Sequence, residues 1–183
     1  MKKLTFLLIS SILLVLTSCD KQFDTASQNS SELKSAQLEA ELKSGHMVQN
    51  FRAHLSGQNE VPANPSQATG EVIFQLSKDG MELSYKLIVA NLDDIRMSHI
   101  HLAPEGSNGN IVVWLYPSAP PAVLIPGTTN GILAEGVITK ANLMRDMAGK
   151  TILDLVEEFK KGNAYVNIHT LAYGGGEIRG QIK

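Results

Sequence analysis

The sequence predicts an all-β fold, an antiparallel sandwich or barrel with one short helical insertion. From residue 51 onward, short runs of alternating apolar and polar residues recur, and clusters of glycine and proline separate them. Alternation with a period of two is typical of strands that bury one face. Strands do not alternate regularly with helices, as they would in a parallel βαβ sheet. The pattern therefore argues against a doubly wound α/β fold.

The clearest local prediction is a β-hairpin centred on Asp79-Gly80. An Asp-Gly pair is typical of hairpin turns because both residues tolerate positive φ. Alternation on both sides of this turn places one set of apolar residues on a common face. These residues are expected to share one core: Val72, Phe74, Leu76, Leu83, Tyr85, Leu87 and Val89.

Several further strands follow the hairpin, with loops between them. The run 111–116 is apolar on both faces, which predicts a strand buried between layers, with Trp114 in the core. Proline and glycine clusters indicate loops at 117–121 and 127–131. The remaining strands are expected at 98–102, 133–139, 164–170 and 177–182.

One helix interrupts the strand pattern. Thr151 and Asp154 have the spacing of a capping box, which predicts that the helix begins there. Gly162 follows two lysines and is expected to end the helix. Residues 142–147 can add a turn of helix before it. The apolar residues between the two ends follow helical spacing: Ile152, Leu155, Val156 and Phe159.

Residues 1–18 have the three parts of a secretory signal peptide. Two lysines precede an apolar run from Leu4 to Leu16, which is too short to span a bilayer as a helix. Leu16-Thr17-Ser18-Cys19 resembles the lipobox of bacterial lipoproteins. This resemblance implies cleavage before Cys19, lipidation of its thiol, attachment to a membrane, and a location in the bacterial cell envelope outside the cytoplasm.

Residues 19–49 are predicted to form a lipidated N-terminus and a flexible tether, since they are rich in polar residues and poor in large apolar ones. Residues 32–43 can form a short helix within this tether. The formal net charge of the chain is -2 and no dense basic run occurs, which argues against a nucleic-acid partner. Cys19 is the only cysteine, so an intramolecular disulfide is impossible.

Three histidines mark the candidate functional site. His99 and His101 are two residues apart and point to one face if their segment is extended. His169 lies in another predicted strand. Neutral imidazole suits copper or zinc, and a His-x-His strand with a distant third histidine is a recurrent arrangement for these metals. The three histidines are therefore the candidate metal ligands, with copper or zinc as the candidate cofactor.

The same region also fits a structural role. If the polar faces of its strands converge, Glu60, Asn167, Glu177 and Arg179 join the histidines in one cluster. We then expect Glu177 or Glu60 to pair with Arg179, because a buried polar group without a partner costs ~1–3 kcal/mol. Such a network can fix strand register without any ligand. The residues alone leave both interpretations open.

Four motifs, in the right order, resemble the CHRD domain, a module repeated in chordin and also found alone in bacterial proteins. They lie at residues 55–62, 99–101, 165–170 and 176–182. The resemblance places the domain at residues 50–183 and implies an immunoglobulin-like β-sandwich with a suggested kinship to copper/zinc superoxide dismutases. In chordin the domain belongs to an extracellular binder of growth factors. The resemblance therefore implies a binding or structural module, with an extracellular protein or glycan as its candidate partner.

Catalysis is not expected. Superoxide dismutases also use a His-x-His strand in a β-sandwich, but their further histidines and disulfide have no counterparts here, where only His46 and His54 remain. A Gly-x-Ser-x-Gly nucleophile elbow is also absent. The sequence thus predicts a lipid-anchored, non-catalytic binding or structural module. The alternative is a copper- or zinc-binding envelope protein that uses the three histidines.

The lipid anchor can be tested on the mature protein. We expect the chain to begin at an acylated Cys19 and to leave the membrane in detergent but not in a high-salt or carbonate wash, because several acyl chains hold a protein stably. Mass spectrometry of the N-terminal peptide and membrane fractionation measure the two properties. An unmodified Cys19, or a mature N-terminus at another residue, would contradict the prediction.

Overall fold

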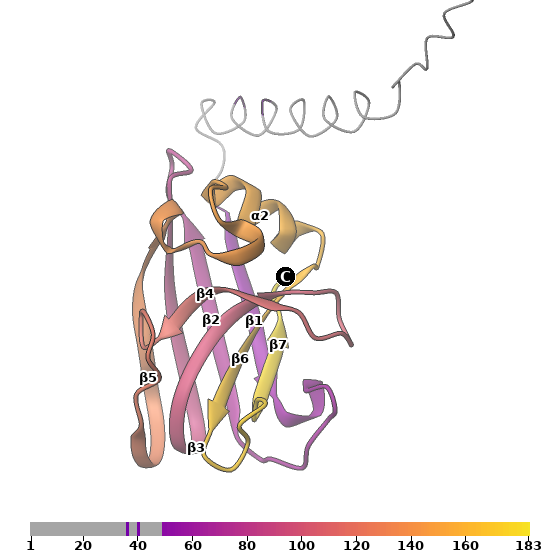
Figure 1. The fold of residues 1–183 in the computed structure, drawn as a ribbon, viewed down its shortest axis with the longest axis vertical. Helices are drawn as coiled ribbons and strands as arrows, with labels where there is room; N and C mark the ends of the chain where they lie inside the picture. The colour runs from indigo at the N-terminus through magenta and orange to yellow at the C-terminus, as the bar shows by residue number, and fades with distance from the viewer. Residues whose placement is uncertain (1–35, 37–39, 41–48) are drawn as a thin grey trace, which may run out of the picture.

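The structure is a computed structural model that describes residues 49–183 and the isolated positions Ala36 and Ala40. Ala36 and Ala40 are helical and exposed. The predicted signal peptide, Cys19 and the rest of the tether up to residue 48 lie outside the described residues. The strands are β1 (Asn50–Ser56), β2 (Thr69–Leu76), β3 (Glu82–Leu102), β4 (Asn110–Tyr116), β5 (Ile125–Thr139), β6 (Ala164–Thr170) and β7 (Ile178–Gln181). The helix α2 (Ile152–Lys160) precedes β6 (Figure 1).

Every strand pairing within the described residues is antiparallel. The strands follow the order β2-β1-β7-β6-β3-β4, and β3 pairs with β2 as well, so the sheet closes on itself like a barrel. Strand β5 joins through β3. The expected all-β fold with one short helical insertion is confirmed.

Strand β3 is longer than the sequence indicated. Its first half pairs with β2 and β5, and its second half pairs with β6 and β4. The sequence suggested two separate strands, but register shifts and positive φ at Asn91 and Asp94 let one strand bend between the two sets of partners. Bulges of this kind bend a strand without ending it.

The loop predicted at residues 127–131 is wrong, because β5 passes through this segment. The strand begins at Ile125, and Thr128 and Thr129 pair with Asp93 and Leu92 of β3. Gly127 and Gly131, at the two ends of the 127–131 segment, have positive φ. Such glycines fit a strand whose pairing with its partner is irregular. The glycines were therefore a signal of irregular pairing and not of chain reversal.

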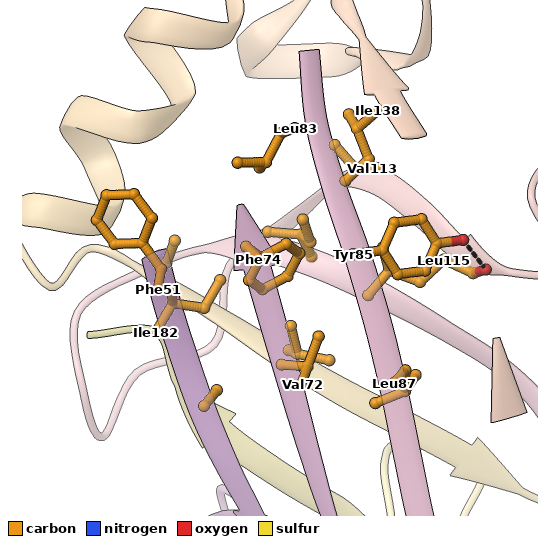
Figure 2. Packing of buried hydrophobic residues seen from close by; sticks show 14 of the residues in the cluster. Phe51, Val72, Phe74, Leu83, Tyr85, Leu87, Val113, Leu115, Ile138 and Ile182 are labelled. Carbon is orange, nitrogen blue, oxygen red and sulfur yellow. Dashed lines mark hydrogen bonds between the residues drawn. The ribbon is translucent and has the colours of Figure 1, made fainter. Parts of the chain in front are cut away.

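The predicted hairpin is confirmed. Val72, Phe74 and Leu76 of β2 pair with Leu87, Tyr85 and Leu83 of β3, respectively, and all six side chains are buried. The Tyr85 hydroxyl donates a hydrogen bond of 2.8 Å to the carbonyl of Leu115, so the phenol is satisfied within the core (Figure 2).

The helix α2 covers one end of the barrel (Figure 1). Its capping box is present as predicted, with Thr151 and Asp154 each accepting from the other's backbone. Its buried face places Phe159 against Phe51, with ring centres 5.4 Å apart, and against Phe74, at 5.3 Å. The helical turn expected at residues 142–147 consists of two 3-10 turns, Lys140–Asn142 and Arg145–Met147.

The two ends of the domain lie side by side. Arg52 and Lys183 exchange two backbone hydrogen bonds of 2.9 Å, from each amide to the other's carbonyl. Lys183 thereby continues the pairing of the C-terminal segment with β1. In the part of the chain that the structure describes, no helix has the length and apolarity needed to cross a membrane.

Gly180 is required by the close contact between β7 and β1. A Cβ there would overlap the carbonyl oxygen of His54 and lie 2.7 Å from its carbonyl carbon. We expect Gly180→Ala to lower the free energy of unfolding by ~1–3 kcal/mol, because backbone atoms must shift. Urea unfolding measures the change.

Gly174→Ala is the matched control, since no atom lies within 4 Å of the position its Cβ would take. Both substitutions reduce the freedom of the unfolded chain equally, so the difference between them isolates the contact. Equal free energies of unfolding for the two variants would show that the contact is not restrictive.

Candidate metal centre

The three histidines lie on the face of the sheet opposite the apolar core. His99 of β3 pairs with Asn167 of β6, and Asn167 pairs with Arg179 of β7. In the neighbouring row, His101 pairs with Tyr165. Because side chains alternate along a strand, these residues share one face, while those between them belong to the hydrophobic core. The polar faces therefore converge.

Two connections bury this polar face. Residues 103–109 link β3 to β4, and residues 171–177 link β6 to β7. Arg179 donates to the carbonyl of Ser107 at 2.7 Å and to Oδ1 of Asn108 at 3.0 Å, which fixes the first connection over the sheet. As a result, the three histidine side chains are only 0–7% exposed.

Backbone carbonyls orient two of the three imidazole rings. Nδ1 of His101 lies 2.9 Å from the Gly109 oxygen, and Nδ1 of His169 lies 3.0 Å from the Gly174 oxygen. A carbonyl can only accept, so each Nδ1 carries the proton and each Nε2 has a lone pair. The lone pair on Nε2 of His169 accepts a hydrogen bond of 3.3 Å from Nδ1 of His99. Histidines that ligate metals typically donate their other ring N–H to a backbone carbonyl in this way.

Nitrogens of the three rings converge. Nδ1 of His99 lies 3.3 Å from Nε2 of His169, and one nitrogen of each ring lies within 4.8 Å of the others. Two ligands of one tetrahedral ion, with bonds of about 2.0–2.1 Å, would be separated by about 3.3–3.4 Å. His99 and His169 already have this spacing. Among the described residues, this is the only group of three or more histidine, cysteine, aspartate or glutamate side chains whose ligand atoms all lie within 4.8 Å of one another.

Several buried polar atoms in this region have no hydrogen-bond partner among the described residues. They are Nε2 of His99, Nε2 of His101, Oδ1 of Asn167 and Oε1 of Glu60. A buried polar atom without a partner costs ~1–3 kcal/mol and is rare in native proteins. Nε2 of His101 therefore has an unused lone pair, whereas the nitrogen of His99 that faces His169 is Nδ1 and not the unsatisfied Nε2.

Burial keeps the imidazoles neutral. It lowers the pKa of His99 from 6.5 to about 3 and that of His101 from 6.5 to about 4. Burial lowers the pKa of His169 as well. Neutral imidazole is the form that ligates a metal. At neutral pH the three rings are thus in the protonation state that a metal requires.

The expected ion pair between Arg179 and Glu177 or Glu60 is wrong. Within the described residues Arg179 forms no ion pair, and its guanidinium lies 3.4 Å from the centre of the Tyr165 ring. A planar guanidinium stacks well on an aromatic face, and its Nη1 and Nη2 each donate one hydrogen bond to the 103–109 connection.

The two glutamates of the predicted polar cluster, Glu177 and Glu60, have different surroundings. Glu177 accepts hydrogen bonds from the hydroxyls of Ser66, at 2.7 Å, and Thr170, at 2.6 Å, which satisfies its carboxylate without a cation. Burial raises the pKa of Glu60 from 4.5 to about 7, although the charge of Arg179 opposes the change. Glu60 is therefore partly protonated at neutral pH.

Sequence reasoning missed the residues that position the rings. Tyr165 stacks on His101 with centres 4.8 Å apart, and Trp114, expected in the core, instead packs edge-on against His99 at 4.3 Å. The orienting carbonyls belong to glycines that follow His101 by eight residues and His169 by five. Only the presence of a glycine in each following loop pointed to them.

These features define a closed antiparallel β domain with a buried three-histidine face. A family model of the CHRD domain matches residues 51–182 of the chain, and the chain belongs to this family. The matched segment contains all three histidines and the four residues of the predicted polar cluster, whereas Cys19 lies outside it. A search of curated proteins and a search of solved structures each found no match.

The neutral histidines predict that the metal-free protein loses stability in acid. Their folded pKa values lie below about 6.5, the ordinary value for an unfolded chain. Between that pH and about pH 4 the unfolded state binds more protons, so the free energy of unfolding falls as the pH falls. Each histidine adds a slope of up to about 1.4 kcal/mol per pH unit.

Glu60 acts in the opposite direction and provides an internal check. Its folded pKa of about 7 exceeds the unfolded value of 4.5, so its contribution is full below 4.5 and is lost as the pH rises through 7. Urea unfolding between pH 4 and 8 should show the acid loss, and Glu60→Gln should steepen it. A flat profile for the unaltered protein would contradict neutral buried histidines.

Proposed function

We propose that this chain is a lipid-anchored protein of the bacterial cell envelope whose CHRD domain binds a copper or zinc ion without catalysing a reaction. One observation carries the metal: backbone carbonyls fix the Nδ1 protons of His101 and His169, so that both Nε2 atoms are unprotonated, and Nε2 of His169 lies 3.3 Å from Nδ1 of the third buried imidazole, His99. The lipobox that ends in Cys19 supports the anchor and the location.

A purely structural network accounts less well for the same residues. A network that only fixed strand register would satisfy its own buried atoms, as Glu177 does with Ser66 and Thr170. The histidine side of the cluster leaves Nε2 of His99 and His101 without partners. Nε2 of His101 is an unsatisfied nitrogen of the kind that ligates metals, and an ion shared with the neighbouring imidazoles would give it a partner that the protein does not.

The closed surroundings favour binding over catalysis. The aromatic rings of Trp114 and Tyr165 pack against two of the imidazoles. A surface cavity of about 600 Å³ reaches Glu60 and Arg179, but the three histidines do not line it. Catalysis would require a cavity that brings a substrate to the metal, whereas holding an ion requires no such cavity. We therefore assign the ion a role as bound cargo or as a structural ligand.

Metal binding can be measured by calorimetric titration of the mature chain in detergent. We expect one ion per chain with a submicromolar Kd, and His101→Ala should weaken binding at least 100-fold because it removes one ligand. Circular dichroism checks that the variant is folded. His54→Ala is the matched control, since His54 is exposed on β1 and contributes no ligand. Absence of binding by copper and by zinc would refute the proposal.

A further inference from the structure

A cavity of about 600 Å³ lies over the neighbouring strands β1 and β7, which Figure 1 shows side by side. Arg52 of β1 and Gln181 of β7 line the cavity from the sheet, since the alternation of β1 turns Arg52 away from the apolar core. Residues 58–61, after β1, and residues 105–106, in the β3–β4 connection, line it from outside the sheet. Pockets that hold small molecules have volumes of about 300–1,000 Å³, and this cavity falls within that range.

The lining of this cavity is polar. Among the described residues that form it, Val61 has the only aliphatic side chain, and no phenylalanine, tyrosine or tryptophan takes part. Pockets for apolar ligands are lined mainly by aliphatic and aromatic side chains. The cavity therefore suits a strongly hydrated ligand that is recognised through hydrogen bonds.

The charges around the cavity cancel. The lining contains three basic and three acidic side chains, and His54 adds no charge in the formal count at pH 7. The bases are Arg52, Arg179 and Lys183, and the acids are Glu60, Glu71 and Glu105. A site for a phosphate or a sulfate has an excess of arginine and lysine, and a site for a cation has an excess of acids. The balance of charge favours an uncharged ligand.

The amide side chains of the cavity present acceptors. Gln58, Asn59 and Gln181 each donate through the amide nitrogen to a backbone carbonyl, at 3.4, 3.1 and 2.7 Å, respectively. Their nitrogens are thus used within the protein, which leaves their oxygens to accept. Oε1 of Gln181 is buried without a hydrogen-bond partner among the described residues, and so is Oε1 of Glu60. A ligand that fits this lining must supply donors, which phosphate, sulfate and carboxylate groups lack.

The basic side chains present donors. Arg52 is exposed and forms no ion pair among the described residues. Nζ of Lys183 lies 3.8 Å from Glu105, but both side chains are exposed, so this pair is weak. The ligand must therefore offer acceptors as well as donors. A hydroxyl group does both, and a saccharide carries several hydroxyl groups on a compact frame.

The paired strands beneath the cavity disfavour a peptide. Extended peptides often bind by adding a strand to the open edge of a sheet. Strand β1 pairs with β2 on one edge and with β7 on the other, and β7 pairs with β1 and β6. The sheet beneath the cavity thus has no open edge where a peptide backbone can pair.

We infer that the cavity over β1 and β7 is a binding site for a short, uncharged oligosaccharide. The oxygens of Gln58, Asn59 and Gln181 accept hydrogen bonds from its hydroxyl groups, and Arg52 and Lys183 donate to its oxygens. The three histidines do not line the cavity, so this inference does not depend on the proposed metal binding.

Calorimetric titration of the metal-free mature chain tests the inference, in a detergent whose head group is not a sugar. The probes are maltotriose, cellotriose and triacetylchitotriose, and the comparison ligands are a sulfated heparin trisaccharide and the peptide trialanine. We expect at least one neutral trisaccharide to bind with a submillimolar Kd and both comparison ligands to bind at least tenfold more weakly. Raising NaCl from about 0.05 M to about 0.5 M should leave the affinity unchanged, because salt screens only interactions between charges.

An arginine substitution tests the location. Arg52→Ala should weaken saccharide binding about tenfold, because it removes a charged donor. Arg96→Ala is the matched control, since Arg96 is exposed on β3 and does not line the cavity. Circular dichroism checks that both variants are folded.

Three results would overturn the inference. They are absence of binding by all three neutral trisaccharides, binding of the heparin trisaccharide or of trialanine at least as tight as theirs, and equal affinities of Arg52→Ala and Arg96→Ala. The first removes the saccharide site, the second replaces it with an anion or a peptide site, and the third places the saccharide outside this cavity. None of them bears on the histidines, whose metal binding is measured separately.

Discussion

The backbone hydrogen bonds along both edges of β3 hold the domain together. The strand pairs with β2 and β5 through its first half and with β6 and β4 through its second half. Its bend converts one sheet into a closed one, and this closure gives the domain an apolar inside and a separate polar face. Two of the three histidines lie on β3 and the third on its partner β6. The candidate centre is thus a direct product of the pairing that closes the fold.

The polar face is unusual because it is buried although it lies outside the apolar core. The connections over it supply what the buried groups need: carbonyls for two histidines and acceptors for Arg179. Arg179 is tolerated at 2% exposure because it stacks on Tyr165 and donates hydrogen bonds through Nη1 and Nη2. On this face, the buried atoms without a hydrogen-bond partner among the described residues are Nε2 of His99 and His101 and the side-chain oxygens Oε1 of Glu60, Oδ1 of Asn167 and Oε1 of Gln181. This contrast within one face supports the proposed metal site over a purely structural network.

The sequence predicted the features that depend on neighbouring residues. The Asp79-Gly80 hairpin, the capping box of α2 and the alternation of β6 each follow from local chemistry. The continuity of β3 and β5 could not be predicted, because glycines within an irregular ladder look like a loop. The partners of Arg179 come from a connection some 70 residues away, so the sequence offered a nearby glutamate in their place. The orienting carbonyls are backbone groups, which leave no residue-specific trace.

The pairing of Arg52 with Lys183 has a consequence for how such a domain is used. Since the chain enters and leaves the fold at adjoining positions, the domain is a closed unit with a single point of attachment. It can be strung in series with copies of itself, or inserted into a surface loop of a host protein, without separating any of its strands. Modularity of this kind arises from two backbone hydrogen bonds and does not depend on what the polar face binds.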